Sequence, residues 1–315
     1  MRAERIRRKP RALSRDGRHL TDSRCKALFV GLATIDLSYV VDKIPRRNEK
    51  ISVSSQEITS GGPAANAAIT FAALGGSCAL VTAIGKHALA AVIRDEMRRF
   101  SIALHDIGAE QSAAPPVSSI LVLRGTGERM VVSANAAAFP PISVLFDPRW
   151  LEGVRILLVD GHYMQLCIRA AQLARSRGIP AVLDSGSWKE NMEDLLPWVN
   201  IAICSDDFRP PGCRDDIDAL EFLARAGIAR VAITRGAAPI RYRQDGAAGE
   251  IPVEQVFARD TLGAGDIFHG AFCFRTCEGY AFIDALKFAS QLATFSCRHI
   301  GTRAWIGEFV ATRQR

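Results

Sequence analysis

The sequence lacks the features of several classes of protein. Among its 315 residues, no stretch of 18 uncharged apolar residues could form a membrane-spanning helix. Residues 1–26 contain no apolar core of a secretory signal, and no segment alternates basic with aromatic side chains as a nucleic-acid-binding surface would. We therefore expect a cytoplasmic protein that binds neither a membrane nor nucleic acid.

Metal-binding cysteine patterns are also lacking. The eight cysteines include no Cys-x-x-Cys pair, and no pair of histidines stands at the spacing of metal ligands. Most of the cysteines lie in apolar segments, so we expect reduced core thiols in a reducing compartment rather than zinc ligands. The eight residues are Cys25, Cys78, Cys167, Cys204, Cys213, Cys273, Cys277 and Cys297.

The excess of positive charge lies entirely at the amino end. The net charge is +7, but residues 1–26 alone hold ten Lys or Arg against three acids, so residues 27–315 are balanced. We expect this basic leader to be a disordered extension or the product of a misassigned start codon. An organelle transit peptide would also be rich in Arg, but Glu4, Asp16 and the scarcity of Ser argue against it.

Between residues 27 and 306, short apolar strands alternate with helical patterns, which is typical of a parallel sheet covered by helices on both faces. The expected strands are 27–33, 78–84, 156–161, 180–184, 200–204 and 229–234. The expected helices are 64–75, 88–100, 163–178, 215–227, 264–277 and 282–299. The fold class is therefore α/β with a doubly wound, mostly parallel sheet, followed by a terminal tail over 307–315.

Other strand-like segments have no helical partner. They lie before and after the first strand–helix units in the sequence, at residues 50–59, 117–123 and 129–134. They predict a small separate sheet, with strands near 50–59 and 117–134. Ordinary edge strands of the main sheet are the alternative.

The most informative segment reads Asp260-Thr261-Leu262-Gly263-Ala264-Gly265-Asp266 and runs into an apolar helix. Small residues at 263–265 allow backbone N–H groups to approach a ligand, and a helix start directs those donors and its positive dipole end at an anion. Because Asp266 would repel an anion that was merely bound, we interpret it as the base that deprotonates an attacking hydroxyl in phosphoryl transfer. A Gly-rich turn with Asp as a helix cap is the alternative.

A second glycine turn, Ser60-Gly61-Gly62-Pro63, opens another small-residue helix. Together, GGPAANAAITFAALGG near the amino end and DTLGAGDIFHGAF near the carboxyl end resemble the two signatures of the PfkB, or ribokinase-like, carbohydrate kinases over residues 27–306. Segments 30–36 and 41–45 are most similar to the ketohexokinase side of this family. The resemblance implies a ribokinase-like fold whose small sheet is a lid that excludes water from the sugar.

The resemblance also implies roles for matching residues. Asp266 matches the catalytic base, and the helix start matches the hole that holds the transferred phosphate, formed by Gly263, Ala264, Gly265 and the Asp266 amide. The positions that match sugar-binding residues are Asp36, Gly61, Gly62 and Asn66. We expect Asp36 to follow the strand 27–33 at its carboxyl end, where a turn acid is the alternative interpretation.

No Walker-type phosphate loop is present. Instead, Thr234-Arg235-Gly236 resembles the family's turn that contacts nucleotide phosphate, where Arg235 is either an added positive charge or an ordinary surface arginine. The resemblance places the adenine between the turns 234–238 and 252–262 and the helix 282–299. Candidate contacts there are Thr261 and Gln291.

The reaction implies ATP and Mg²⁺, and part of the family is activated by K⁺, which the carboxyl-terminal residues here do not decide. The chain departs from the family at 204–208, where many members have Asn-x-x-Glu, and at 85–90, where many have Gly-x-Asp-x-x-Gly. Asp206 or Asp207 could replace the lost acid, although a helix cap is the favoured role for them. No residue is therefore assigned as a metal ligand.

We predict an ATP-dependent kinase that phosphorylates a primary hydroxyl of a ketose or pentose. The alternatives are a nucleoside kinase of the same fold, with Tyr39 and Phe139 as candidate base-stacking residues, and a catalytically silent sugar- or nucleotide-binding relative. Because exposed strand edges readily pair, a homodimer through the lid is also expected.

Overall fold

The computed structural model describes residues 25–53, 55–134 and 146–313. Most of the predicted leader, 1–26, lies outside the described residues, and so does Phe139. Among the helices of the described ranges, none is both long enough and apolar enough to cross a membrane.

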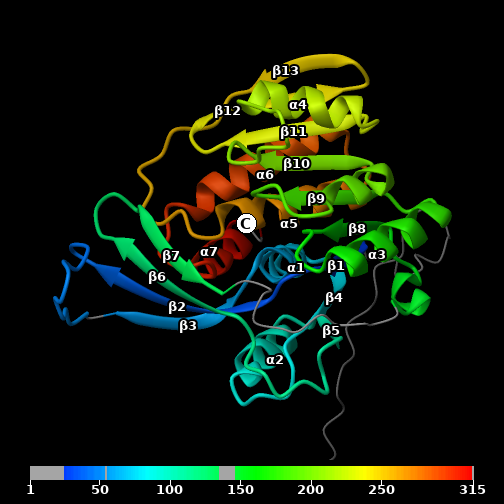
Figure 1. Ribbon diagram of the computed structural model, residues 1–315. Helices are drawn as coiled ribbons and strands as arrows, with labels where there is room; N and C mark the ends of the chain where they lie inside the picture. Colours follow the sequence, from blue (N-terminus) through cyan, green and yellow to red (C-terminus); the bar gives the residue numbers. More distant parts are fainter. Residues whose placement is uncertain (1–24, 54, 135–145, 314–315) are drawn as a thin grey trace, which may run out of the picture.

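A nine-stranded sheet runs through the molecule (Figure 1). Its strand order is β13-β12-β11-β10-β9-β8-β1-β4-β5, in which β12 pairs antiparallel with both β11 and β13 and all other neighbours are parallel. The strands are β1 (Lys26–Val30), β4 (Ser77–Thr82), β5 (Ala103–Asp106), β8 (Ile156–Val159), β9 (Ala181–Ser185), β10 (Ile201–Ser205), β11 (Arg230–Arg235), β12 (Ala238–Gln244) and β13 (Ala247–Ile251). The predicted doubly wound, mostly parallel sheet is confirmed.

Helices cover both faces of this sheet, because side chains of each strand alternate between two apolar cores. In β1, Ala27 and Phe29 join one core while Leu28 and Val30 join the other. The first core is covered by α1 (Pro63–Ala73), α2 (Ala90–Arg99), α5 (Ala264–Cys277), α6 (Phe282–Ser296) and α7 (Ala304–Arg313). The second is covered by α3 (Met164–Ser176) and α4 (Asp216–Arg225). Buried Trp305 anchors α7, so a helix occupies much of the segment expected to be a tail.

A separate four-stranded sheet projects to one side of the main sheet in Figure 1. Its order is β3-β2-β6-β7, with β2 (Thr34–Val41), β3 (Gln56–Gly61), β6 (Val117–Leu123) and β7 (Arg129–Ser133). The predicted small sheet is confirmed, but its first segment was wrong in part, since the strand begins at Gln56 rather than at residue 50. We call this sheet the lid.

Asp36 follows main-sheet strand β1 in the chain, as expected, but it lies within lid strand β2 rather than directly at the end of β1. The reason is that β1 ends at Val30, where the chain leaves the sheet. The Gly31 amide still donates to Val81 O of β4 (3.1 Å), but the next two amides bond to side chains: Leu32 N donates to Asp160 Oδ2 (2.7 Å) and Ala33 N to Thr82 Oγ1 (3.1 Å). The lid strand therefore begins only a few residues before Asp36.

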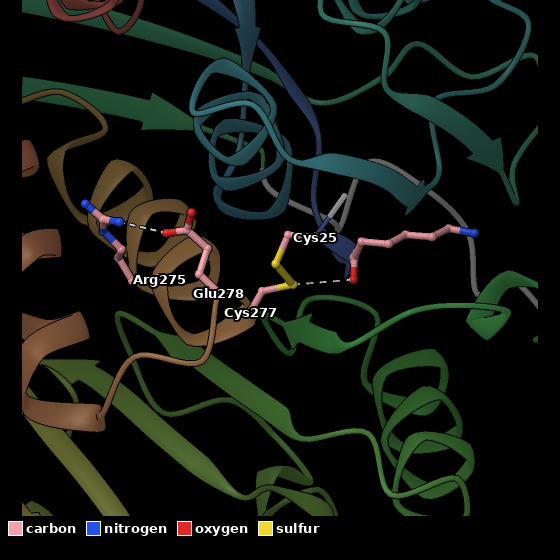
Figure 2. Close-up of a disulfide and its surroundings, with 5 residues drawn as sticks. Cys25, Arg275, Cys277 and Glu278 are labelled. Atoms are coloured by element: carbon pink, nitrogen blue, oxygen red, sulfur yellow. Dashed lines mark hydrogen bonds and ion pairs between the residues drawn. A yellow bond between two sulfur atoms is a disulfide. The ribbon is translucent and has the colours of Figure 1, made fainter. Parts of the chain in front are cut away.

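A disulfide joins Cys25, before β1, to Cys277, the last residue of α5 (Figure 2). The expectation of reduced thiols is wrong for these two cysteines, whose Cα atoms lie 5.7 Å apart across a sequence separation of 252 residues. Pattern analysis had no means of detecting this pair, because its closeness arises only from the tertiary fold. The other six cysteines are free thiols, four of them buried.

Helices α1 and α5 approach each other closely at Gly270. A Cβ atom at this position would lie 2.4 Å from the carbonyl oxygen of Ala67 and 2.7 Å from Cβ of Thr70, both on α1. Only glycine therefore permits this distance between the two helix backbones. The two signature segments of the sequence, one on each helix, are held together by this contact.

We expect Gly270→Ala to lower the free energy of unfolding by about 1–3 kcal/mol, because the added methyl group overpacks the contact between α1 and α5. Equilibrium denaturation in urea measures the change. Gly307→Ala is the matched control: Gly307 is also a helix residue, but its Cβ would meet no atom within 4 Å. The control should be neutral or slightly stabilising. Equal losses in both variants would contradict the close approach.

Candidate active site

The start of α5 is an exposed set of backbone donors. Gly263 adopts a left-handed conformation (φ 69°) immediately before the helix, and within the described part of the chain no side chain caps this end. The first N–H groups of a helix have no partner inside it, so the amides of Gly265 and Asp266 are available to an anion. Ala264 N donates only a long bond, 3.3 Å, to Thr261 O.

Asp266 stands in this first turn and faces α1. Its Oδ2 accepts a hydrogen bond from Nδ2 of Asn66 at 2.7 Å, across 200 residues of sequence. The close packing of α1 and α5 thus brings together the two polar side chains that the signatures had singled out. Asp266 as a whole residue is partly exposed.

The pKa of Asp266 is raised to about 7. Burial against the protein is the largest cause, and the negative charges of Asp184 and Asp36 act in the same direction. The Asn66 hydrogen bond and the neighbouring His269 lower the pKa but do not offset burial. The result is a carboxyl group that exchanges a proton near neutral pH.

Asp36 reaches the same site from the lid. Its Oδ1 accepts a hydrogen bond from Thr34 Oγ1 at 2.7 Å, and burial raises its pKa. A Cβ atom at Gly61 would lie 2.0 Å from Asp36 Oδ2, so the glycine turn makes room for this carboxylate. Gly62 forms the N-cap of α1. The four residues matched to sugar binding are thereby brought to one place.

Arg303, just before α7, was not expected from the sequence. Its Nη2 donates to Asn66 Oδ1 and to Ser60 O, each at 2.8 Å, and its Nε pairs with Glu96 Oε1 at 2.7 Å. Both charged side chains of this pair are only 11% exposed. No motif marks these two residues in the sequence; a pair of buried opposite charges emerges only from the fold.

His269, one helical turn after Asp266, was also missed. Its Nδ1 lies 2.7 Å from Gly265 O and its Nε2 lies 3.1 Å from Ile203 O. Because carbonyl oxygens only accept, both contacts are hydrogen bonds when both ring nitrogens carry protons. Asp184 Oδ2 lies 3.4 Å from Nδ1. Burial raises the pKa of Asp184, whereas His269 lowers it.

The proposed phosphate turn lies at the end of β11, where Gly236 begins the hairpin to β12. Thr234 Oγ1 donates to Cys204 O at 3.3 Å. The Arg235 guanidinium is engaged by Asp216 Oδ2 at 2.9 Å and Glu250 Oε1 at 3.7 Å, so its charge is already balanced by two acids. Within the described residues, no hydrogen bond or ion pair joins this turn to Asp266.

The other two nucleotide candidates lie apart from each other. Gln291 is exposed on α6 and lines a cavity of about 250 Å³ whose other residues include Ile251, Pro252 and Ser290. Thr261 instead faces the lid: its backbone oxygen and its Oγ1 each accept from Arg129 Nη1 at 2.7 Å. Gln291 is thus placed at a cavity, whereas Thr261 holds the lid against the segment that precedes the anion hole.

Among the described residues, no three His, Cys, Asp or Glu side chains form a group that could hold a metal ion. Asp206 and Asp207 are exposed in the turn after β10. The favoured cap role for them is wrong, since Asp215 is the residue that caps α4, accepting from Asp218 N at 2.8 Å. Two free carboxylates therefore stand at the carboxyl end of a central strand.

Similarity to known proteins identifies the family. The sequence model of the "pfkB family carbohydrate kinase" proteins matches residues 25–306. The chain belongs to this family. It is therefore a phosphotransferase of the carbohydrate kinase type, with an alcohol group as acceptor.

Similar proteins include ribokinase of Arabidopsis thaliana, 24% identical over 289 residues that cover 85% of this chain and 74% of the relative. Ketohexokinase of Mus musculus is 22% identical over 290 residues, covering 86% and 95%. The structure of Arabidopsis thaliana ribokinase complexed with ribose and ATP has a TM-score of 0.70 at 21% identity, covering 88% of this chain and 94% of that chain. The ribokinase-like fold is thereby confirmed, while the placement nearest ketohexokinase stays a prediction.

We expect the Asp266 carboxyl to titrate with a midpoint of about 7, followed by the ¹³C shift of its carboxyl carbon and assigned by its loss in Asp266→Asn. Asp184→Asn should lower that midpoint, because it removes a negative charge that raises the Asp266 pKa. A wild-type midpoint near the ordinary value of 3.8 would contradict the electrostatics described here.

Proposed function

We propose that this kinase transfers the γ-phosphate of ATP to a primary hydroxyl group of a ketose or pentose, with Asp266 as general base. One observation carries the proposal: a carboxyl group with a pKa near 7 stands in the first turn of a helix whose amides are uncapped. A general base is most effective when its pKa lies near the working pH. The same helix start supplies donors for the phosphate that the hydroxyl attacks.

The Asp266 carboxylate acts on the attacking hydroxyl group, and the start of α5 acts on the phosphoryl group that is transferred. Asp266 accepts the proton of the attacking hydroxyl, which raises the nucleophilicity of that oxygen. The amides of Ala264, Gly265 and Asp266, with Gly263 setting the turn, hold the transferred phosphoryl oxygens at the positive end of the α5 dipole. Both groups belong to one rigid helix, so their spacing does not depend on a mobile loop.

The sugar side fits a polyol. Asp36 supplies a carboxylate that accepts hydroxyl protons, and the amide of Asn66 both donates and accepts. Gly61 and Gly62 leave the space beside these groups free of side chains, since even a Cβ at Gly61 would collide with Asp36. A substrate with several adjacent hydroxyls satisfies this set, whereas an apolar ligand would leave the remaining hydrogen-bond capacity of the Asp36 carboxylate unused.

The nucleotide side fits ATP. We assign its phosphates to the α5 start and to the turn of Thr234 and Gly236, and its adenine to the cavity beside Gln291. Arg235 contributes less than its charge suggests, because Asp216 and Glu250 already pair with it. Magnesium, when bound with ATP, neutralises phosphate charge; the exposed Asp206 and Asp207 carboxylates suit an ion that takes few protein ligands.

The two alternatives predict different outcomes in one assay. ADP release with magnesium-ATP is measured against fructose, ribose, tagatose and adenosine, with and without potassium. Release with a sugar supports the proposal, and release with adenosine alone would instead identify a nucleoside kinase. Thermal stabilisation by ligands without any release would identify a silent binding protein.

We expect Asp266→Asn to lower kcat by roughly 10²–10⁴-fold, the usual contribution of a general base, with little change in sugar affinity. The measurement is steady-state ADP release together with calorimetric sugar binding. Asp284→Asn is the matched control, because Asp284 occupies the same position in the first turn of α6 and is exposed. Turnover of Asp266→Asn equal to that of the control would remove Asp266 from the mechanism.

We further propose that two chains associate through the lid. Strand pairing places Ile58, Leu37 and Val132 in one cross-strand row, on the face opposite Asp36. Met130 lies on the same face, and Ile58, Met130 and Val132 are 52%, 49% and 76% exposed. Apolar side chains gathered on one face of a projecting sheet are typical of an interface.

Val132→Glu should therefore shift the protein from dimer to monomer in sedimentation velocity, since it places a charge within the apolar face. Val131→Glu is the control, because Val131 is 48% exposed but points to the opposite face. A wild-type protein that sediments as a monomer at all concentrations would contradict the proposed dimer.

A further inference from the structure

We propose that Arg303 is a positioning residue for catalysis: it fixes the side-chain amide of Asn66 and, through that amide, the carboxylate of Asp266. This inference rests on the proposed function, since it assumes that Asp266 is the base. Three contacts form the chain of interactions: Glu96 Oε1 to Arg303 Nε at 2.7 Å, Arg303 Nη2 to Asn66 Oδ1 at 2.8 Å, and Asn66 Nδ2 to Asp266 Oδ2 at 2.7 Å.

The orientation of the Asn66 amide follows from the chemistry of its two neighbours. A guanidinium group has only donors, and an ionised carboxylate has only acceptors. Asn66 can bond to both only if its oxygen faces Arg303 and its nitrogen faces Asp266. A reversed amide would place an N–H against a guanidinium N–H and an oxygen against a carboxylate oxygen. Arg303 therefore dictates which end of the amide Asp266 meets.

Arg303 is itself held from several sides. Glu96 Oε1 accepts from its Nε, while Ser60 O accepts from its Nη2. Glu96 in turn uses Oε2 to accept from the backbone N (2.7 Å) and Oγ (2.5 Å) of Ser60. The guanidinium plane is thus fixed by α2 and by the residue that precedes the glycine turn. A planar guanidinium group with fixed partners positions the Asn66 amide better than the flexible ammonium group of a lysine would.

The consequence for Asp266 is electrostatic. The Asn66 hydrogen bond stabilises the ionised carboxylate and lowers the Asp266 pKa, against burial and two neighbouring negative charges. If Arg303 no longer holds the Asn66 oxygen, the amide is free to rotate and the Asp266 pKa rises further. At neutral pH, a smaller fraction of the base is then ionised. The charged or titratable groups that face Asp266 are Asp184, Asp36 and His269, and those that face Arg303 are Glu96, Glu57 and Asp36.

Asn66 held in this orientation still has hydrogen-bonding groups available for the sugar. An amide has two N–H donors and two lone pairs on its oxygen, and the described contacts use one of each. One N–H and one lone pair remain, which suits a hydroxyl group that both donates and accepts. Arg303 thus aligns the base and a sugar contact through a single side chain.

The experiment compares variants that break the Arg303–Glu96 pair with and without releasing Asn66. Glu96→Gln weakens the pair but keeps the guanidinium on Asn66. The double variant Glu96→Gln, Arg303→Met removes the contact between Arg303 and Asn66. Arg303→Met alone would leave the buried Glu96 carboxylate without its partner, so the double variant is expected to fold better. Arg303→Lys retains one donor toward Asn66 but loses the planar fork.

We expect the double variant to lose on the order of tenfold or more in kcat at pH 7 relative to Glu96→Gln. In a plot of kcat against pH, the fall in kcat on the acid side, its acid limb, should move to higher pH. Glu96→Gln, which keeps Arg303 on Asn66, should shift the acid limb less than the double variant does, and Arg303→Lys should lie between the two. Equal kcat and equal acid limbs in Glu96→Gln and the double variant would overturn the inference. A merely structural role for Arg303 would change unfolding temperature without moving the limb.

A carboxyl ¹³C titration of Asp266 separates this inference from the proposed function. If the wild-type protein phosphorylates no substrate of the panel, the proposed function fails, but the titration still measures the Asp266 midpoint in each variant. A higher midpoint in the double variant than in Glu96→Gln supports the role of Arg303. Identical midpoints in the two would overturn it.

Discussion

The close approach of α1 and α5 is the constraint on which the site depends. Gly270 lets the two helix backbones meet, and the hydrogen bond between Asn66 and Asp266 lies one turn away along the same interface. Each helix start is a glycine turn, so two sets of uncapped amides open toward the same region. The geometry of the proposed active site is therefore a property of helix packing in the core, not of surface loops.

The proposed active site gathers negative charge beside the helix start to which we assign the phosphate. Asp36, Asp184 and Asp266 approach one another, and burial raises the pKa of each. The Arg303 guanidinium contacts Asn66 Oδ1 rather than Asp266 itself, and the His269 ring lies 3.4 Å from Asp184. The donors beside Asp266 are the backbone amides at the start of α5. Their partial charges favour an anion without neutralising the base.

Sequence patterns predicted the elements that carry a strong local signal. The buried parallel strands and the helices that follow them were found because apolar runs of this kind are distinctive, and the two signatures located Asp266 and Asn66. Strands β12 and β13 were missed because Arg241, Tyr242 and Glu250 interrupt any apolar run. Arg303, Glu96 and the Cys25–Cys277 disulfide were missed for another reason: each depends on residues that only the tertiary fold brings together.

The disulfide has a practical consequence for the geometry of the whole chain. Cys277 and Asp266 stand at opposite ends of α5, eleven residues or roughly 16 Å apart along the helix axis. Whatever precedes Cys25 thus joins the folded domain at the end of α5 opposite the proposed active site. A purification tag or a surface attachment placed there would leave the substrate entrance open, whereas one fused beside the lid would obstruct it.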